Sequence, residues 1–167
     1  MWPKDTREAL DTFYGRHSLG FDGTPTARWR RDNLVTFKAP YRLTLSWDLS
    51  AHATRVTCHR RVAESLERIL AGILEHYGSL EAVQQNRMHL YGGCYNYRPV
   101  RNGNRLSTHA WGAAIDLDPE RNPLGVPYDE SAGMMPRAVV DLFEAEGWTW
   151  GGTWPRRPDC MHFQATS

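Results

Sequence analysis

Two short segments of the sequence carry the residues best suited to chemistry. The first holds His109 and Asp116, and the second holds Asp159 and His162. Two imidazoles and one carboxylate suit zinc, and three protein ligands leave a fourth position for a water molecule. Calcium would require more oxygen ligands. A second carboxylate, Asp159, could then accept the proton of a zinc-activated water and pass it on. Taken singly, each residue is better explained as a satisfied polar side chain at a strand edge.

The residues around these segments alternate in the way that half-buried strands do. From 113 to 118, three residues are expected to face the core: Ala113, Ile115 and Leu117. Three are expected to face the other side: Ala114, Asp116 and Asp118. In the second segment Met161 and Phe163 are expected to point inward, and His162 and Gln164 outward. If the two strands are neighbours, Asp116 and His162 share one face, and His109 enters from the turn that Gly112 allows.

The rest of the chain predicts the elements that must position these residues. Helical spacing of apolar residues and terminal glycines or prolines predict four helices, over about 3–14, 58–77, 79–85 and 136–146. Strands are expected over 41–47, 88–97, 113–118 and 161–164, and residues 15–33 are expected to form a loop. Helices and strands mix without regular alternation, which favours an α+β fold over a doubly wound one.

Length and composition narrow the class of protein. The 167 residues suit one domain, 1–167, with a single core. The net charge of +1 gives no support for broad binding to nucleic acid or to an anionic membrane. Three cysteines without a repeating spacing predict reduced thiols rather than a disulfide framework. There is no apolar run long enough to span a membrane, and the amino end lacks an apolar signal segment. We therefore expect synthesis in the cytoplasm.

The two segments also resemble a known family. Residues 107–116 have the form SxHxxGxAxD, which resembles the signature of the M15 zinc D-alanyl-D-alanine peptidases, and Asp159-x-x-His162 is similar to that family's second motif. The similarity covers residues 91–164 best. It is closest to small L-alanyl-D-glutamate endopeptidases and D-Ala-D-Ala carboxypeptidase-like proteins of phage and bacteria.

The resemblance implies roles for individual residues. Zinc would be held by three ligands: His109, Asp116 and His162. Asp159 would be the catalytic acid/base, where many relatives have glutamate. Arg98, in Tyr97-Arg98-Pro99, would hold the substrate and steady the oxyanion, and Ser107 would lie near the substrate. Asp118 stands where relatives often have asparagine and is not expected to be a ligand. The implied fold is an antiparallel sheet with helices packed on one side, shared with the hedgehog signalling domain.

The function that follows is hydrolysis of peptidoglycan stem peptides by a monomeric zinc peptidase. Two alternatives stay open: a dipeptidase acting on free D-Ala-D-Ala, and a non-catalytic zinc-containing binding module. A phage endolysin released by a helper fits these features, and a bacterial cytosolic or effector protein fits almost as well. Several other residues are expected to be structural: His59 in capping or packing, Cys160 as a packed thiol, and Trp111, Trp148, Trp150 and Trp154 in the core, with groove lining as their alternative.

Overall fold

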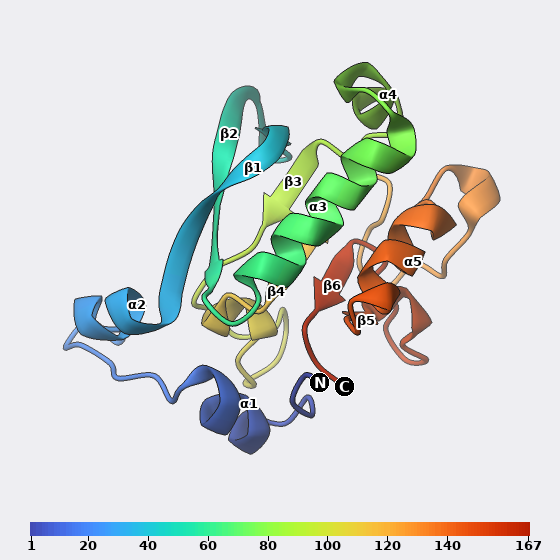
Figure 1. The fold of residues 1–167 in the computed structure, drawn as a ribbon. Helices are drawn as coiled ribbons and strands as arrows, with labels where there is room; N and C mark the ends of the chain where they lie inside the picture. Colours follow the sequence, from blue (N-terminus) through green and yellow to red (C-terminus); the bar gives the residue numbers. More distant parts are fainter.

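The computed structural model describes residues 1–167 and contains one six-stranded sheet (Figure 1). The strands are β1 (Leu34–Leu45), β2 (Asp48–His59), β3 (Leu90–Gly93), β4 (Ala114–Leu117), β5 (Thr149–Trp150) and β6 (His162–Gln164). Their order in the sheet is β2-β1-β3-β4-β6-β5. The α+β class is confirmed.

The sheet is mixed rather than fully antiparallel. β1 and β3 pair in parallel, and every other neighbouring pair is antiparallel. The helices α3 (Ala63–Tyr77) and α4 (Leu80–Gln85) lie between β2 and β3 in the chain. They carry the chain back across the sheet, so that β3 runs in the same direction as β1. The expectation of an antiparallel sheet is therefore wrong at this one pair.

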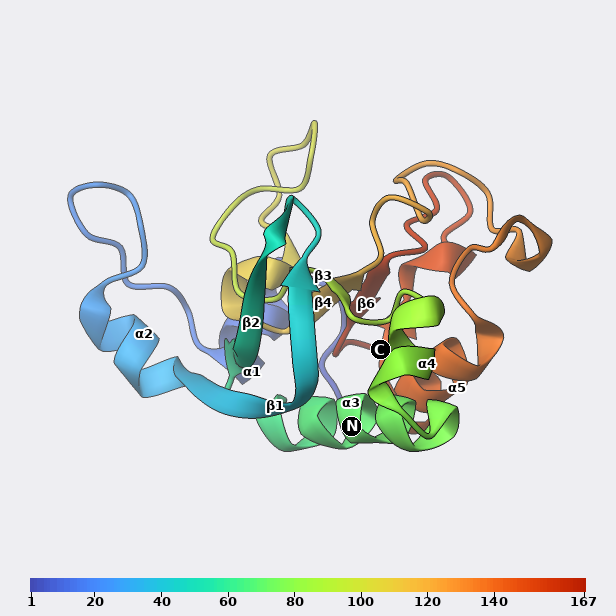
Figure 2. The same ribbon diagram turned by 90° about the horizontal axis from the view of Figure 1, so that it is seen from above.

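The main helices gather on one face of the sheet. α3 packs on β1 and against α5 (Arg137–Ala145), and Figure 2 shows α3, α4 and α5 together on that side. α3 buries four apolar residues there: Leu66, Ile69, Leu70 and Ile73. The opposite face carries long loops, around residues 94–106, 118–130 and 151–160 (Figure 2). The site described below lies under these loops.

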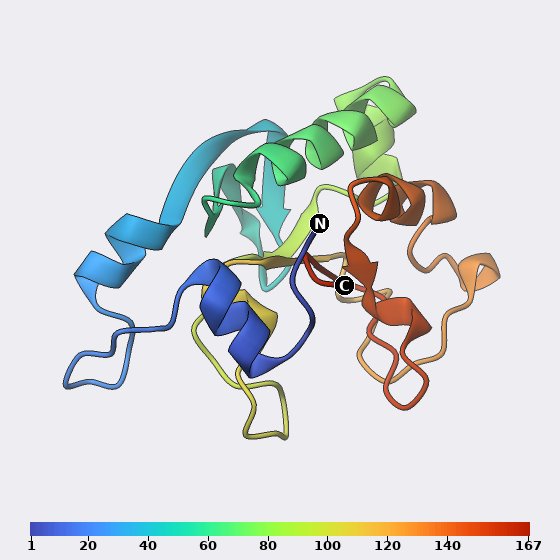
Figure 3. The same cartoon turned by 60° about the horizontal axis from the view of Figure 1, so that its bottom comes forward.

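Two short helices lie at the end of the sheet. α1 (Arg7–Tyr14) contacts the 3-10 helix η1 (Thr108–Trp111), as Figure 3 shows, and α2 (Ala27–Asn33) leads into β1. The remaining short turns are η2 (Glu130–Ala132) and η3 (Gly151–Thr153). The two chain ends meet, because the backbone N–H of Ser167 donates to the carbonyl of Pro3 at 2.9 Å.

The buried hydrophobic residues form one cluster of 32, which joins the helical face to the strands. Phe143 of α5 stacks on Phe163 of β6, with ring centroids 3.8 Å apart. Each helix is too short or too polar to cross a membrane.

Two predicted elements begin later than expected. The first helix starts at Arg7, because Thr6 caps it by accepting from the backbone N–H of Ala9 at 3.3 Å. The long helix starts at Ala63, because the residues from Cys58 onward complete β2 and a turn. Both helices end at the expected glycines, Gly15 and Gly78.

Two other elements were not expected. α2 lies in the segment assigned to a loop and buries only Trp29, so it has no apolar stripe to reveal it. β2 is exposed along its first half and buried only near its end, so its alternation is weak. Trp47, expected in a strand, lies in the turn between β1 and β2 with 64% of its surface exposed.

Candidate metal centre

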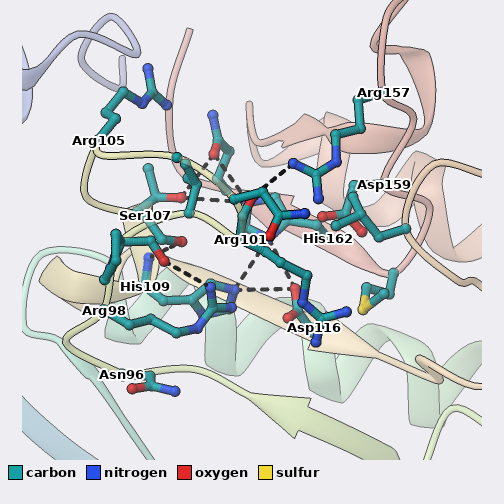
Figure 4. Close-up of a pocket in the computed structure, with 18 of the residues that line it drawn as sticks. Asn96, Arg98, Arg101, Arg105, Ser107, His109, Asp116, Arg157, Asp159 and His162 are labelled. Carbon is teal, nitrogen blue, oxygen red and sulfur yellow. Dashed lines mark hydrogen bonds and ion pairs between the residues drawn. The ribbon is translucent and has the colours of Figure 1, made fainter.

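Three side chains meet on the loop-covered face of the sheet. Asp116 of β4 and His162 of β6 are direct partners in the antiparallel register. His109 comes from η1, which Ser107 caps by accepting from the backbone N–H of His109 at 3.4 Å. The Nε2 atom of His109 lies 3.2 Å from Asp116 Oδ1 and 3.2 Å from His162 Nδ1, and the last two atoms are 2.9 Å apart (Figure 4). All three residues are buried.

The outer hydrogen bonds fix which ring nitrogen of each histidine faces this triangle. His109 Nδ1–H donates to the carbonyl of Cys94 at 2.7 Å, and His162 Nε2–H donates to Gln164 Oε1 at 3.0 Å. A neutral imidazole carries one ring proton. Both inward nitrogens are therefore lone-pair acceptors, and they face a carboxylate oxygen.

Three acceptors that face one another need a cation between them. Burial by itself would raise the pKa of Asp116, but the neighbouring His109 and His162 outweigh it and hold that pKa well below its usual range. Burial opposes the charged form of His162, yet its bond to Asp116 raises its pKa above the ordinary value. A metal ion bound here would be held by these three acceptor atoms and would compete with a proton for them.

The geometry fits a small tetrahedral ion. A tetrahedral zinc with bonds of about 2.0–2.1 Å separates its ligand atoms by roughly 3.3 Å, close to the separations of 2.9–3.2 Å in this triangle. The expected alignment of Asp116 with His162 across two neighbouring strands, and the entry of His109 from the preceding turn, are both confirmed. This His-Asp-His group is compatible with a metal site.

Asp159 lies in the same cleft as the triangle. Its Oδ1 atom is buried and has no hydrogen-bond partner within the protein. Burial raises the pKa of Asp159 to about 6, although the charges of His162 and Arg157 oppose the rise. A carboxyl group with that pKa exchanges a proton readily near neutral pH.

Two glycines that sequence reasoning missed make room for the carboxylates. A Cβ on Gly151 would lie 2.6 Å from the carbonyl oxygen of Asp159, and one on Gly92 would lie 2.8 Å from Asp116 Cβ. Both contacts are shorter than real Cβ atoms tolerate. The only available signal was glycine inside apolar, strand-like segments, which marks close approach of another part of the chain.

The cleft above the triangle has a volume of about 1300 Å³ and is lined by 24 residues, four of them hydrophobic. Arg98 and Ser107 both line it. Arg98 is half-buried, and its Nη1 donates to the carbonyl of Pro99 at 3.3 Å. Ser107 is buried and serves as the cap of η1. Their roles toward a substrate stay predictions.

Two expectations about side-chain direction are wrong. Asp118, expected beside Asp116, has a φ of +44° and forms an ion pair with Arg87 at 2.7 Å. That backbone turn takes it away from the cleft. Met161, expected to point inward, lines the cleft instead, because β6 begins one residue later, at His162.

The residues expected to be structural behave as follows. His59 is buried, donates from Nε2 to the carbonyl of Tyr14 at 2.9 Å, and accepts the backbone N–H of Arg61 at Nδ1. Cys160 is a buried free thiol, and burial raises its pKa to about 11. The core contains three of the four tryptophans: Trp111, Trp148 and Trp150. Trp154 instead lines the cleft, 5.5 Å from His162 between ring centroids.

Comparison with known proteins points to the same part of the chain. Residues 101–165 match the model of an M15 peptidase family, described as D-alanyl-D-alanine carboxypeptidase. The matched region contains the three residues of the triangle and Asp159. Searches of curated proteins and of solved structures each found no match. The family match supports a peptidase and a peptide substrate.

Proposed function

We propose that this protein is a zinc peptidase that hydrolyses peptidoglycan stem peptides, as an L-alanyl-D-glutamate endopeptidase or a D-alanyl-D-alanine carboxypeptidase. The observation that carries the proposal is the buried triangle of His109, Asp116 and His162, whose three acceptor atoms face one another. It lies inside the region that matches a carboxypeptidase family. Zinc is favoured by the donor set of two imidazoles and one carboxylate.

Zinc held by His109, Asp116 and His162 would supply Lewis acidity and would lower the pKa of a bound water to about 7. Around it, Asp159 accepts the proton of the attacking water at its unpartnered Oδ1 and returns it to the leaving amine. Arg98 holds the carbonyl oxygen as negative charge develops there; one such donor is typically worth a hundredfold or more in rate. Ser107 keeps η1, and with it His109, in place.

The size of the cleft favours a stem peptide over a free dipeptide. Its volume of about 1300 Å³ exceeds the range of roughly 300–1000 Å³ typical of small-ligand pockets. A free D-Ala-D-Ala dipeptide would leave most of it filled with water. We further propose that residues 1–167 form one monomeric domain, and that it acts on the cell wall once released, as a phage endolysin does.

The proposal is tested by release of new amino groups from purified peptidoglycan. The zinc-loaded protein is expected to release them, whereas the chelated protein and Asp159→Asn are expected to be inactive. Asp32→Asn removes an exposed carboxylate far from the cleft and serves as the matched control. Mass spectrometry of the fragments identifies the bond: free D-alanine indicates the carboxypeptidase, and a new L-alanine carboxyl end indicates the endopeptidase. Equal inactivity of the wild type and Asp159→Asn would favour a binding module.

A further inference from the structure

The mouth of the cleft carries three arginines without an acidic partner: Arg98, Arg101 and Arg157. No carboxylate oxygen lies within 4.0 Å of any of their guanidinium nitrogens, the distance that defines the ion pairs elsewhere in the molecule. The fourth arginine of the cleft, Arg105, is different. It binds both carboxylate oxygens of Asp5, at 2.7 and 2.8 Å. Arg105 is therefore satisfied within the protein, and the other three are not.

The three free arginines lie on both sides of the metal centre. Arg98 precedes η1, which carries His109, whereas Arg157 precedes Asp159 by two residues (Figure 4). Arg157 Nη1 donates to the carbonyl of Arg101 at 2.8 Å. This bond joins the 94–106 loop to the 151–160 loop across the cleft. It uses one of the five N–H donors of Arg157 and none of those of Arg101.

Unpaired positive charge in a cleft attracts an anionic ligand. The molecule as a whole carries a net charge of only +1. The positive charge of these arginine side chains is thus concentrated at the cleft. It surrounds a centre whose two acidic residues already have roles, Asp116 as a metal ligand and Asp159 in proton transfer. Guanidinium groups bind carboxylates through paired N–H donors.

We propose that the substrate is an acidic peptide, and that Arg101 and Arg157 bind one of its internal carboxylates while Arg98 serves the oxyanion of the scissile carbonyl. This rests on the proposed function and deepens it, because it adds a second anion subsite that selects stem peptides with free internal carboxyl groups. A peptide whose internal carboxyl groups are amidated loses the Arg101–Arg157 contact. A peptide whose terminal carboxyl alone is amidated keeps the Arg101–Arg157 contact and is expected to bind as the free peptide does.

Peptide binding tests the subsite without requiring hydrolysis. The zinc-loaded Asp159→Asn protein is titrated with synthetic stem peptides ending in D-Ala-D-Ala, and binding is followed by tryptophan fluorescence, since Trp154 lines the cleft. The peptides have all carboxyl groups free, only the internal ones amidated, or only the terminal one amidated. Amidating the internal carboxyl groups is expected to weaken binding about tenfold at low salt and less at high salt.

The arginine variants then locate the contact. Arg157→Gln and Arg101→Gln are expected to weaken binding of the fully free peptide about tenfold and to leave binding of the internally amidated peptide unchanged. Arg157→Lys, which keeps the charge, should restore part of the difference in affinity between the free and the internally amidated peptide. Arg156→Gln, an exposed neighbour outside the cleft, is the matched control and should bind as its parent does.

The outcomes separate this proposal from the proposed function. Equal binding of the free and internally amidated peptides, or the same loss in Arg156→Gln as in Arg157→Gln, would overturn the second subsite. Discrimination by charge without hydrolysis of any peptide by the wild type would support the subsite and contradict the peptidase.

Discussion

At the scale of single residues, the nearest partner of His162 Nε2 is the amide of Gln164, at 3.0 Å, with Thr108 Oγ1 farther away at 3.4 Å. Gln164 is buried, and its Oε1 accepts both from His162 Nε2 at 3.0 Å and from Thr108 Oγ1 at 2.8 Å. Its Nε2 donates to Thr166 Oγ1 at 2.8 Å, which fixes the amide against rotation. Such outer hydrogen bonds hold a ligand ring in the correct tautomer.

We expect Gln164→Leu to weaken zinc binding about 10- to 100-fold, because the His162 ring loses the acceptor that keeps its Nδ1 unprotonated. Competition with a chromophoric chelator measures the affinity directly. Gln164→Glu keeps an acceptor for His162 Nε2 and should retain most of the zinc affinity. Undiminished affinity in Gln164→Leu would mean that the sheet register alone orients the ring.

His59 gives a second expectation at this scale, for stability. Burial lowers its pKa to about 4, and a proton on Nδ1 would break the bond from the Arg61 N–H. The folded state therefore binds this proton less readily than the unfolded state, whose pKa is about 6.5. The stabilisation is complete above that pH and is lost as the pH falls toward 4.

We expect the free energy of unfolding to fall by about 2 kcal/mol between pH 7 and pH 5 through this residue. Urea unfolding of the chelated protein at the two pH values measures the change. His59→Gln should be less stable at pH 7 but should show a smaller difference between the two pH values. The same pH difference in both proteins would assign the loss to other groups.

At the scale of elements, the sequence predicted the helices and strands that bury a periodic apolar face. The alternation around Asp116 and the spacing in α3 both reflect direct contact with the core, and both elements were located. α2 and β2 were missed because they bury few residues in a regular pattern. The parallel pairing of β1 with β3 depends on contacts distant in sequence.

The same limit applies to the candidate site. The motif spacing indicated which residues could meet, and the β4–β6 register brings them together. Arg98 was indicated by the resemblance, but the cleft positions of Arg101 and Arg157 and the glycines beneath the carboxylates were not, because their roles depend on how separate loops pack. The direction of Asp118 was missed for a local reason, its positive φ.

The loop that carries Asp159 provides a test at this scale. We expect Gly151→Ala to displace Asp159 and to lower the hydrolysis rate at least tenfold, because the added methyl group meets the Asp159 carbonyl at 2.6 Å. Zinc affinity should change little, since the three ligands belong to other segments. Gly72→Ala in α3, which meets only the flexible Leu142 side chain, is the control and should keep full activity.

At the scale of the whole molecule, one core supports both the helical face and the metal face. The 32 buried hydrophobic residues form one continuous core of apolar side chains, which needs no metal to pack. The fold should therefore survive without metal, and zinc should add stability by binding the native state.

We expect zinc at 100 times its dissociation constant to add about 2.7 kcal/mol to the free energy of unfolding. This should appear as a higher melting temperature in thermal denaturation, reversed by chelator. Asp116→Asn, which keeps the side-chain shape, should melt as a folded protein and show a much smaller zinc-dependent shift. A chelated protein without a cooperative transition would mean that the metal is required for folding.

The meeting of the two chain ends has a consequence for protein engineering. Ser167 bonds to Pro3, and Figure 1 shows both ends side by side. Proteins with adjacent ends tolerate circular permutation when the new ends open in an exposed loop. Joining residue 167 to residue 1 through a short linker and opening the chain at Gly23 would place the cut between α1 and α2, away from the cleft. Because residues 1 and 167 lie close together, residues 1–167 in their original order also suit insertion into a surface loop of a host protein.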